Sequence, residues 1–138
     1  MKIEKVKNSE EIRNKIDDIF VEQAKDNNID TNYQNFAYAV KNYNGGILGG
    51  IVGYRLFKEI HITDLSLDKT ARGLGIGEKL IDIVENEVSN NKIDYIVLKT
   101  NRFQGAIDFY KKCGFKIEFI RENEDSRFDR IYMVKKLN

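Results

Sequence analysis

The segment TARGLGIGEKLI, residues 70–81, has the residue types of an anion-binding turn. Gly73, Gly75 and Gly77 stand at every second position, directly before a run with helical periodicity. A helix N-terminus presents free backbone N–H groups and a partial positive charge, and glycines let a phosphate approach the backbone closely. Arg72 adds a full positive charge beside the turn. The segment therefore predicts a site for a phosphate-bearing ligand.

Two common phosphate motifs do not fit this turn. The P-loop pattern requires a Gly-Lys-Ser/Thr ending, which is absent. The dinucleotide fingerprint requires a third glycine at position 78, which is Glu78. The pattern that remains is Arg72-x-x-Gly75-x-Gly77, and a glycine-rich turn without any ligand is its alternative interpretation.

Alternation and helical spacing predict the elements that position this turn. The expected order is strand, helix, three strands, helix, strand, helix and two strands, which is a mixed α/β sheet with helices on its faces. The alternation slips between Ile62 and Leu65, as it would at a β-bulge near residues 64–66. Asn-Gly at positions 44–45 predicts a hairpin turn. The expected strands are 1–6, 35–43, 47–57, 59–67, 94–100, 115–122 and 129–137, and the expected helices are 9–28, 76–88 and 104–113.

Composition narrows the classes of protein. The chain has 138 residues, 41% hydrophobic and 33% charged, which fits one soluble globular domain over residues 1–138. A net charge of +1 gives no reason to expect nucleic acid or a membrane surface as a partner. One cysteine and the absence of a leader-like apolar start favour a cytoplasmic location, and a single histidine argues against a histidine-rich metal site.

Three segments together resemble the GNAT superfamily of N-acetyltransferases. The RGLGIGEKLI segment after LSL is similar to the coenzyme A signature of that family. The segment TNRFQGAIDFYKKCGFK is similar to its later helix, and DRIYMVKKL to its last strand. The resemblance implies the acyl-CoA N-acyltransferase fold, with about seven strands, three to four helices, and two central parallel strands that splay apart.

The resemblance also implies where acetyl-CoA would bind. The splayed strands would be HITDLSL and DYIVLKT, with the cofactor between them. Backbone groups of Leu65, Ser66 and Leu67 would pair with the pantetheine arm, and an N–H near Leu67 would polarise the acetyl carbonyl. The pyrophosphate would be held by the N–H groups of the turn, which are those of Arg72, Gly73, Leu74, Gly75, Ile76 and Gly77.

Direct attack of an amine on a thioester needs a base for the amine and a proton for the departing thiolate. Tyr110, in DFYKK, matches the family tyrosine that donates this proton. The base has three candidates on the strand 59–67: Glu59, His61 and Asp64. Alternation puts Glu59 and His61 on one face, and the bulge decides where Asp64 points. Histidine titrates near neutral pH, but several relatives use no side-chain base, so these alternatives stay open.

One position departs from the family pattern. Many relatives carry an asparagine that bonds the pantetheine three positions before the helix alanine, and this position is Phe103 here. The nearby amides Gln104 and Asn101 are the substitutes that the resemblance suggests for contact with the cofactor.

The expected function is transfer of an acetyl group from acetyl-CoA to a primary amine of a small molecule, a peptide N-terminus or a lysine. The enzyme would be an N-acetyltransferase that transfers a group other than an amino-acyl group. An alternative is a non-catalytic acyl-CoA binder or sensor of the same fold. Exposed edges in FKIEFI and RIYMVKKL could also pair two copies into a homodimer, which does not exclude catalysis.

Overall fold

The computed structural model describes residues 1–88 and 92–137, and these residues group into two compact units, Met1–Thr31 and Asn32–Asn138. Each unit is described by itself. The expected single domain over residues 1–138 stays a prediction.

The first unit is built on helix α1, Glu10–Asp26. The Asn8 side chain accepts a hydrogen bond from the Glu10 N–H at 2.9 Å, and two acidic residues in the first turn complement the helix dipole. The prediction of a helix over residues 9–28 is confirmed. The predicted strand over residues 1–6 is wrong, because these residues form no strand and alternation alone does not supply a partner strand.

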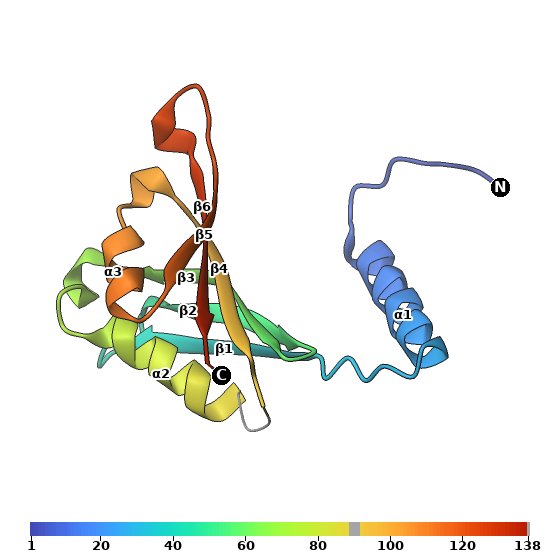
Figure 1. The fold of residues 1–138 in the computed structure, drawn as a ribbon, viewed down its shortest axis with the longest axis horizontal. Helices are drawn as coiled ribbons and strands as arrows, with labels where there is room; N and C mark the ends of the chain where they lie inside the picture. The colour runs from blue at the N-terminus through green and yellow to red at the C-terminus, as the bar shows by residue number, and fades with distance from the viewer. Residues whose placement is uncertain (89–91, 138) are drawn as a thin grey trace. The chain divides into compact units, whose positions relative to one another are not determined.

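The second unit is a six-stranded mixed sheet in the order β1-β2-β3-β4-β6-β5 (Figure 1). Its strands are β1 (Gln34–Lys41), β2 (Ile47–Leu56), β3 (Glu59–Leu67), β4 (Tyr95–Asn101), β5 (Lys116–Arg121) and β6 (Arg130–Lys136). Its α-helices are α2 (Ile76–Val88) and α3 (Ile107–Lys112). Short 3₁₀ turns are η1 (Lys69–Ala71), η2 (Arg102–Gln104) and η3 (Ser126–Phe128). The described residues thus give six strands and three α-helices, rather than about seven strands.

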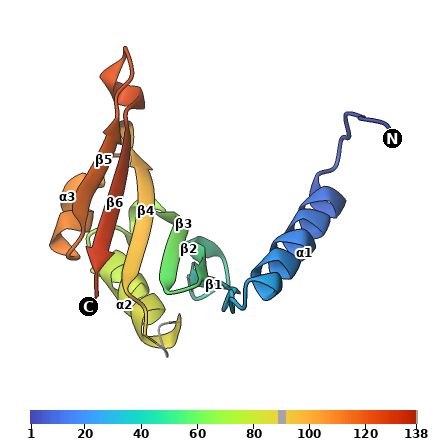
Figure 2. The same cartoon turned by 45° about the vertical axis from the view of Figure 1, so that its right-hand side comes forward.

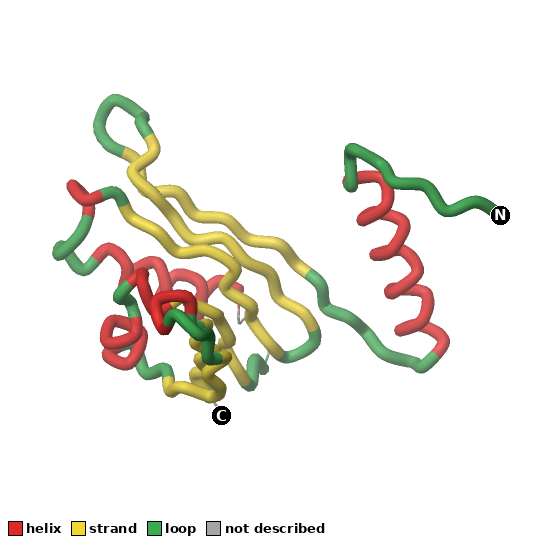
Figure 3. The backbone as a smooth tube through the Cα atoms, turned by 90° about the horizontal axis from the view of Figure 1, so that it is seen from above, coloured by secondary structure: helices red, strands yellow, loops and turns green. Residues whose placement is uncertain are grey.

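The antiparallel hairpins at the start and end of the sheet can be followed in the tube view (Figure 3). The turn predicted at Asn44-Gly45 is confirmed but wider, because Asn42 caps a five-residue loop by accepting the Asn44 and Gly46 N–H groups. Strand β6 lies between β4 and β5, so its two edges are paired and it offers no edge to a second copy. Only β5, of the two segments considered for a dimer, is an edge strand.

The central strands β3 and β4 are parallel and pair only over their first four residues, from Glu59 opposite Tyr95 to Ile62 opposite Leu98. Beyond this point they separate, which confirms the predicted splay. The predicted bulge is also present, but its extra residue is Thr63 rather than a residue in the range 64–66. Strand β3 therefore leaves β4 directly after its bulge.

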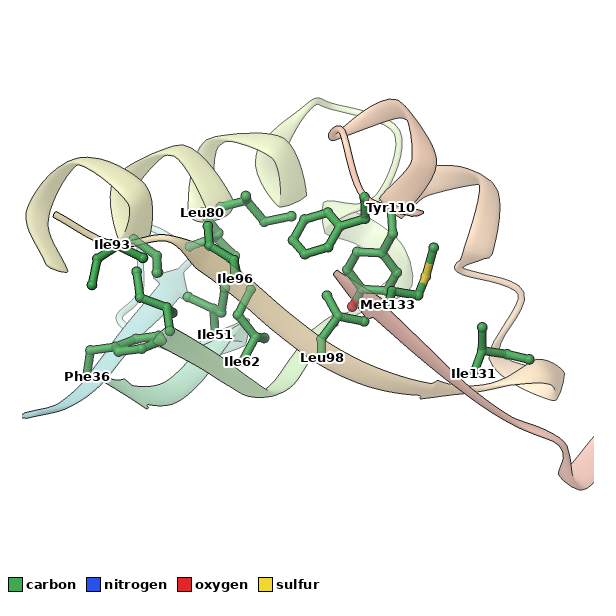
Figure 4. Close-up of a cluster of buried hydrophobic side chains, with 14 residues drawn as sticks. Phe36, Ile51, Ile62, Leu80, Ile93, Ile96, Leu98, Tyr110, Ile131 and Met133 are labelled. Carbon is green, nitrogen blue, oxygen red and sulfur yellow. The ribbon is translucent and has the colours of Figure 1, made fainter. Parts of the chain in front are cut away.

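Helices α2 and α3 lie on the same face of the sheet (Figure 2). Leu80, Ile81 and Val84 of α2 are buried in one cluster with the inward residues of the strands, and Figure 4 shows Leu80 over these residues. The core between helices and sheet consists of Phe36, Ile51, Ile60, Ile62, Leu80, Ile81, Val84, Ile93, Ile96, Leu98, Tyr110, Phe115, Ile131 and Met133.

Helix α3 is shorter than the predicted segment 104–113. Gly105 has φ +66° and separates the 3₁₀ turn η2 from the α-helix. Gly114 ends the helix at φ +96°, with the Phe115 N–H bonded to the Tyr110 carbonyl, as expected of a glycine C-cap. No helix in the described ranges has the length and apolar character needed to cross a membrane.

Candidate functional site

The glycine turn joins η1 to α2, and its glycines serve two different needs. Gly73 and Gly75 have φ of +74° and +75°, in the left-handed region that glycine adopts without a side-chain clash. Gly77 is helical, but a Cβ there would lie 2.9 Å from the ring of Phe109. The first two glycines therefore shape the turn, and the third lets α2 approach α3.

The turn presents a row of backbone donors. The first intrahelical bond of α2 runs from the Lys79 N–H to the Gly75 carbonyl. The N–H groups of residues 73–78 have no acceptor within the described residues. A helix N-terminus with several convergent N–H groups and a dipole is suited to an anion with several oxygens.

Side-chain hydrogen bonds of Asp68 and Arg72 hold the segment 68–72, which joins β3 to the glycine turn. The Arg72 Nε donates to the carbonyl of Leu67 at 2.9 Å, so the guanidinium lies over the end of β3. The Asp68 carboxylate accepts bonds from the Thr70 N–H and hydroxyl at 3.2 and 2.6 Å. The Thr70 hydroxyl bond holds the pKa of this carboxyl below its usual value. A permanent cation is thereby placed beside the free N–H groups.

Two adjoining cavities of about 430 and 360 Å³ follow the splay from the glycine turn toward η2. We call them together the splay groove. Residues that line both cavities include Leu65, Ser66, Leu67, Arg72, Gln104 and Tyr110. The edge of β3 that faces the splay has no neighbouring strand beyond Ile62, so its backbone groups are open to an extended ligand.

Tyr110 comes from α3 and is 6% exposed, yet it lines both cavities of the groove. Its ring packs edge-on against Phe109 and Phe115. Burial, with a smaller effect of the Cys113 thiol, raises the pKa of Tyr110 to about 12. The hydroxyl is therefore protonated at neutral pH and available as a proton donor at the groove.

The two amides proposed from the sequence differ in position. Gln104 lines the groove, but its side-chain oxygen accepts bonds from the Asn101 N–H and the Thr100 hydroxyl at 2.9 and 3.3 Å, which leaves its NH₂ group for a ligand. Asn101 donates to the same oxygen at 3.2 Å and lies outside the lining of both cavities. Leu74 is also outside the lining, with a side chain 65% exposed.

The three base candidates lie on the face of β3 that is opposite to the helices. The His61 Nε2 is 3.1 Å from the Glu59 carboxylate, and the imidazole stacks on Tyr54 with ring centroids 4.7 Å apart. Because the bulge adds Thr63, Asp64 stays on this same face, where it is exposed opposite Val52. Glu59 and His61 line a cavity on this face, which we call the outer cleft, and Asp64 does not.

Sequence reasoning missed several groove residues, among them Thr100 and Phe103 of the η2 region. The sequence predicts Thr100 at the end of a strand, but no sequence pattern shows that this strand end faces a cavity. Phe103 stands out in the sequence only as a departure from the family pattern. The signal that could have found both is their place directly after the splay on β4.

The comparisons with known proteins agree with this geometry. Residues 4–137 match the family described as the acetyltransferase (GNAT) domain. An uncharacterized N-acetyltransferase of Methanocaldococcus jannaschii is 34% identical over 109 residues, which are 75% of this chain and 68% of that protein.

Two solved structures share the fold. An acetyltransferase from Bacillus cereus is 25% identical, with a TM-score of 0.75 over 97% of this chain and 98% of that one. An acetyltransferase from Bacillus anthracis, solved in complex with acetyl coenzyme A, is 26% identical, with a TM-score of 0.65 over 75% of this chain and 63% of that one. The glycine turn, the splay and the family match together show that the chain belongs to the GNAT family of acetyltransferases, with acetyl-CoA as its cofactor.

Proposed function

We propose that this chain transfers the acetyl group of acetyl-CoA to a primary amine by direct attack, with both substrates bound at once. The observation that carries the proposal is the position of Tyr110, which lines the splay groove together with the glycine turn and the open edge of β3. A binder without turnover would not need a proton donor at this place.

The donor half of the site would use the residues of the splay groove. When bound, acetyl-CoA supplies an acetyl thioester. The free N–H groups of residues 73–78 would hold the pyrophosphate together with the Arg72 guanidinium. The Arg72 N–H, expected from the sequence to take part, already donates to the Lys69 carbonyl. The open edge of β3, at residues 65–67, would bond the pantetheine arm in strand fashion. The Gln104 NH₂ group would contact the same arm, and Asn101 would act only by holding the Gln104 side-chain oxygen at 3.2 Å.

The acceptor half would use the opposite side of the splay. The outer cleft and the splay groove are lined by consecutive parts of the same two strands, at Ile62 and Leu98 for the cleft and at Leu65 and Thr100 for the groove. An amine in the cleft could therefore reach a thioester in the groove through the gap between β3 and β4. His61, oriented by Glu59 at 3.1 Å, is the base we favour, because Asp64 lies outside the cleft lining.

The chemical step balances with these groups. The lone pair of the neutral amine attacks the thioester carbon, a C–N bond forms, and the C–S bond breaks. His61 takes the proton that the nitrogen loses, directly or through water, and the Tyr110 hydroxyl gives its proton to the departing thiolate. The N–H near Leu67 would bond the carbonyl oxygen as its negative charge develops. Proton exchange with water then restores both side chains.

A calorimetric titration with acetyl-CoA, followed by a thiol-release assay over a panel of amines, tests the proposal. Binding together with turnover of any amine supports it. Binding without turnover across small amines, peptide N-termini and lysine peptides would instead support an acyl-CoA sensor. No binding at all would mean that the glycine turn is not a site for the phosphates of acetyl-CoA.

A further inference from the structure

The outer cleft is a cavity of about 570 Å³ on the sheet face opposite to α2 and α3. It lies across four strands, β2, β3, β4 and β6, and reaches the edge strand β5. Three tyrosines from different strands, Tyr54, Tyr95 and Tyr132, contribute to its lining. Aromatic faces of this kind accept both aliphatic chains and cations.

Two β-bulges place an extra residue in this cleft. The bulge in β3 leaves Thr63 unpaired, and the bulge in β5 leaves Glu118 unpaired between Ile117 and Phe119. Both extra residues line the cleft. A bulge turns a side chain to the face of the sheet opposite to the one that regular alternation would give it. Without the bulge, the alternation that puts Phe119 beside Tyr132 would turn Glu118 toward the other face.

The strand register puts Glu118 level with the splay. Ile62 pairs with Leu98, Leu98 with Met133, and Met133 with Ile117, so these four residues form one row across the sheet. Glu118 directly follows the last residue of this row. It therefore lies two strands away from β4, which is roughly 10 Å between backbones. A short aliphatic chain that begins at the splay could end at this carboxylate.

The charged side chains of the cleft differ in whether they have an ion-pair partner in the protein. Glu59 is engaged by His61. Glu118 has no ion-pair or hydrogen-bond partner among residues 1–88 and 92–137. Lys99 also lines the cleft, and its positive charge would repel a bound cation. The two carboxylates, Glu59 and Glu118, outnumber this one lysine and leave the lining acidic. An unpaired carboxylate in an aromatic cavity is best complemented by an ammonium group.

We propose that the acceptor is an aliphatic diamine or polyamine, whose first nitrogen is acetylated at the splay while its second, charged nitrogen binds Glu118 beside Tyr132. This inference rests on the proposed function, since it names the acceptor of the same site. The aliphatic segment between the nitrogens would cross the floor of the cleft past Tyr132, which pairs with Lys99 on β4 and with Phe119 on β5.

The test compares 1,4-diaminobutane with 1-aminobutane at saturating acetyl-CoA, using thiol release. The wild-type protein should favour the diamine by about tenfold or more in kcat/KM, as expected for one additional charge-assisted hydrogen bond. Glu118→Gln should remove most of this preference through the KM of the diamine, with kcat and the monoamine nearly unchanged. Lys99→Gln should act in the opposite direction and lower the KM of the diamine.

Glu122→Gln is the matched control, because Glu122 is exposed just beyond β5 and outside the cleft lining, and it should leave the preference intact. Equal turnover of both amines, or an unchanged preference in Glu118→Gln, would overturn the diamine inference while the acetyltransferase function stands. Absence of thiol release with every amine tried, despite acetyl-CoA binding, would remove the proposed function and this inference together.

Discussion

Tyr110 combines two roles that rarely coincide in one side chain. It belongs to the buried core cluster and also lines the splay groove. Burial that raises the pKa to about 12 keeps the proton on the oxygen at any ordinary assay pH. The same burial therefore stabilises the fold and preserves the acid that the proposed reaction needs.

Replacing Tyr110 by phenylalanine should lower kcat by about 100-fold or more, since the ring is kept and only the proton donor is lost. The affinity for acetyl-CoA should change little. Tyr38→Phe is a matched control, because that hydroxyl bonds Glu87 at 2.7 Å and lies outside the groove lining. An unchanged kcat in Tyr110→Phe, measured by thiol release, would remove it as the acid.

Gly75 is the second residue that can be tested by itself. Gly75→Val should strongly weaken acetyl-CoA binding in a calorimetric titration, because φ of +75° excludes a β-branched residue and the new side chain would stand in the groove. Gly45→Val strains the backbone in the same way, at φ +81° in the β1–β2 loop, and has equal open space around its Cβ. That control should lose similar stability yet bind acetyl-CoA normally. Equal binding by both variants would contradict the assignment of the turn.

Among the elements, the turn η2 that follows β4 forms one wall of the splay groove. Strand β4 ends in η2, whose Arg102 pairs with the carboxylate of Asp129 at 3.1 Å. The same carboxylate accepts the Asn123 N–H at 2.8 Å, and the Asp129 side chain is only 7% exposed. The loop between β5 and β6 therefore holds the turn that carries Gln104 and Phe103 into the groove.

Asp129→Ala should destabilise the protein by about 2 kcal/mol, since it removes the buried carboxylate that accepts the bonds of Arg102 and Asn123. It should also weaken acetyl-CoA binding by displacing η2. Asp125→Ala breaks the solvent-exposed pair with Arg127 and should lower the free energy of unfolding much less. Urea unfolding combined with an acetyl-CoA titration separates the two variants. Equal stability losses would show that the buried pair does not hold η2.

The sequence predicted the presence of the strands in the sheet more accurately than their irregularities and their pairing. Alternation located every strand of the sheet, because each strand has one face in the core. It failed for residues 1–6, where the pattern exists without a partner strand. It placed the bulge one residue too late, since sequence shows the slip between Ile62 and Leu65 but not which residue is unpaired. The bulge at Glu118 and the pairing of both edges of β6 depend on neighbouring strands, so they could not be seen in the sequence.

The six-stranded unit carries the splay groove and the outer cleft on opposite faces of one sheet. The helix face carries the glycine turn, Tyr110 and the splay groove, and the other face carries the outer cleft with His61 and Glu118. The sequence predicted the first face from a family motif. The second face has no motif, because it is assembled from single residues on separate strands.

The stability of the molecule should fall as the pH rises above about 10. Tyrosine in the unfolded chain has a pKa near 10, whereas the pKa of Tyr110 in the folded chain is about 12. Between these values the unfolded state releases a proton that the folded state keeps, so the free energy of unfolding decreases by at most roughly 3 kcal/mol from this group. Urea unfolding at pH 9 to 12 measures this change, to which Tyr38 adds in the same direction. The slope should be shallower in Tyr110→Phe, and an identical slope would contradict the assigned burial effect.

The most direct test of the proposed function is a crystal structure with a covalent adduct of coenzyme A, an acetyl linker and 1,4-diaminobutane. We expect the pyrophosphate on the N–H groups of residues 73–78 and the sulfur within hydrogen-bond reach of the Tyr110 hydroxyl. The diamine should pass between β3 and β4 and end at Glu118 in the outer cleft. A sulfur remote from Tyr110, or a diamine that leaves the splay on the helix side, would contradict this expectation.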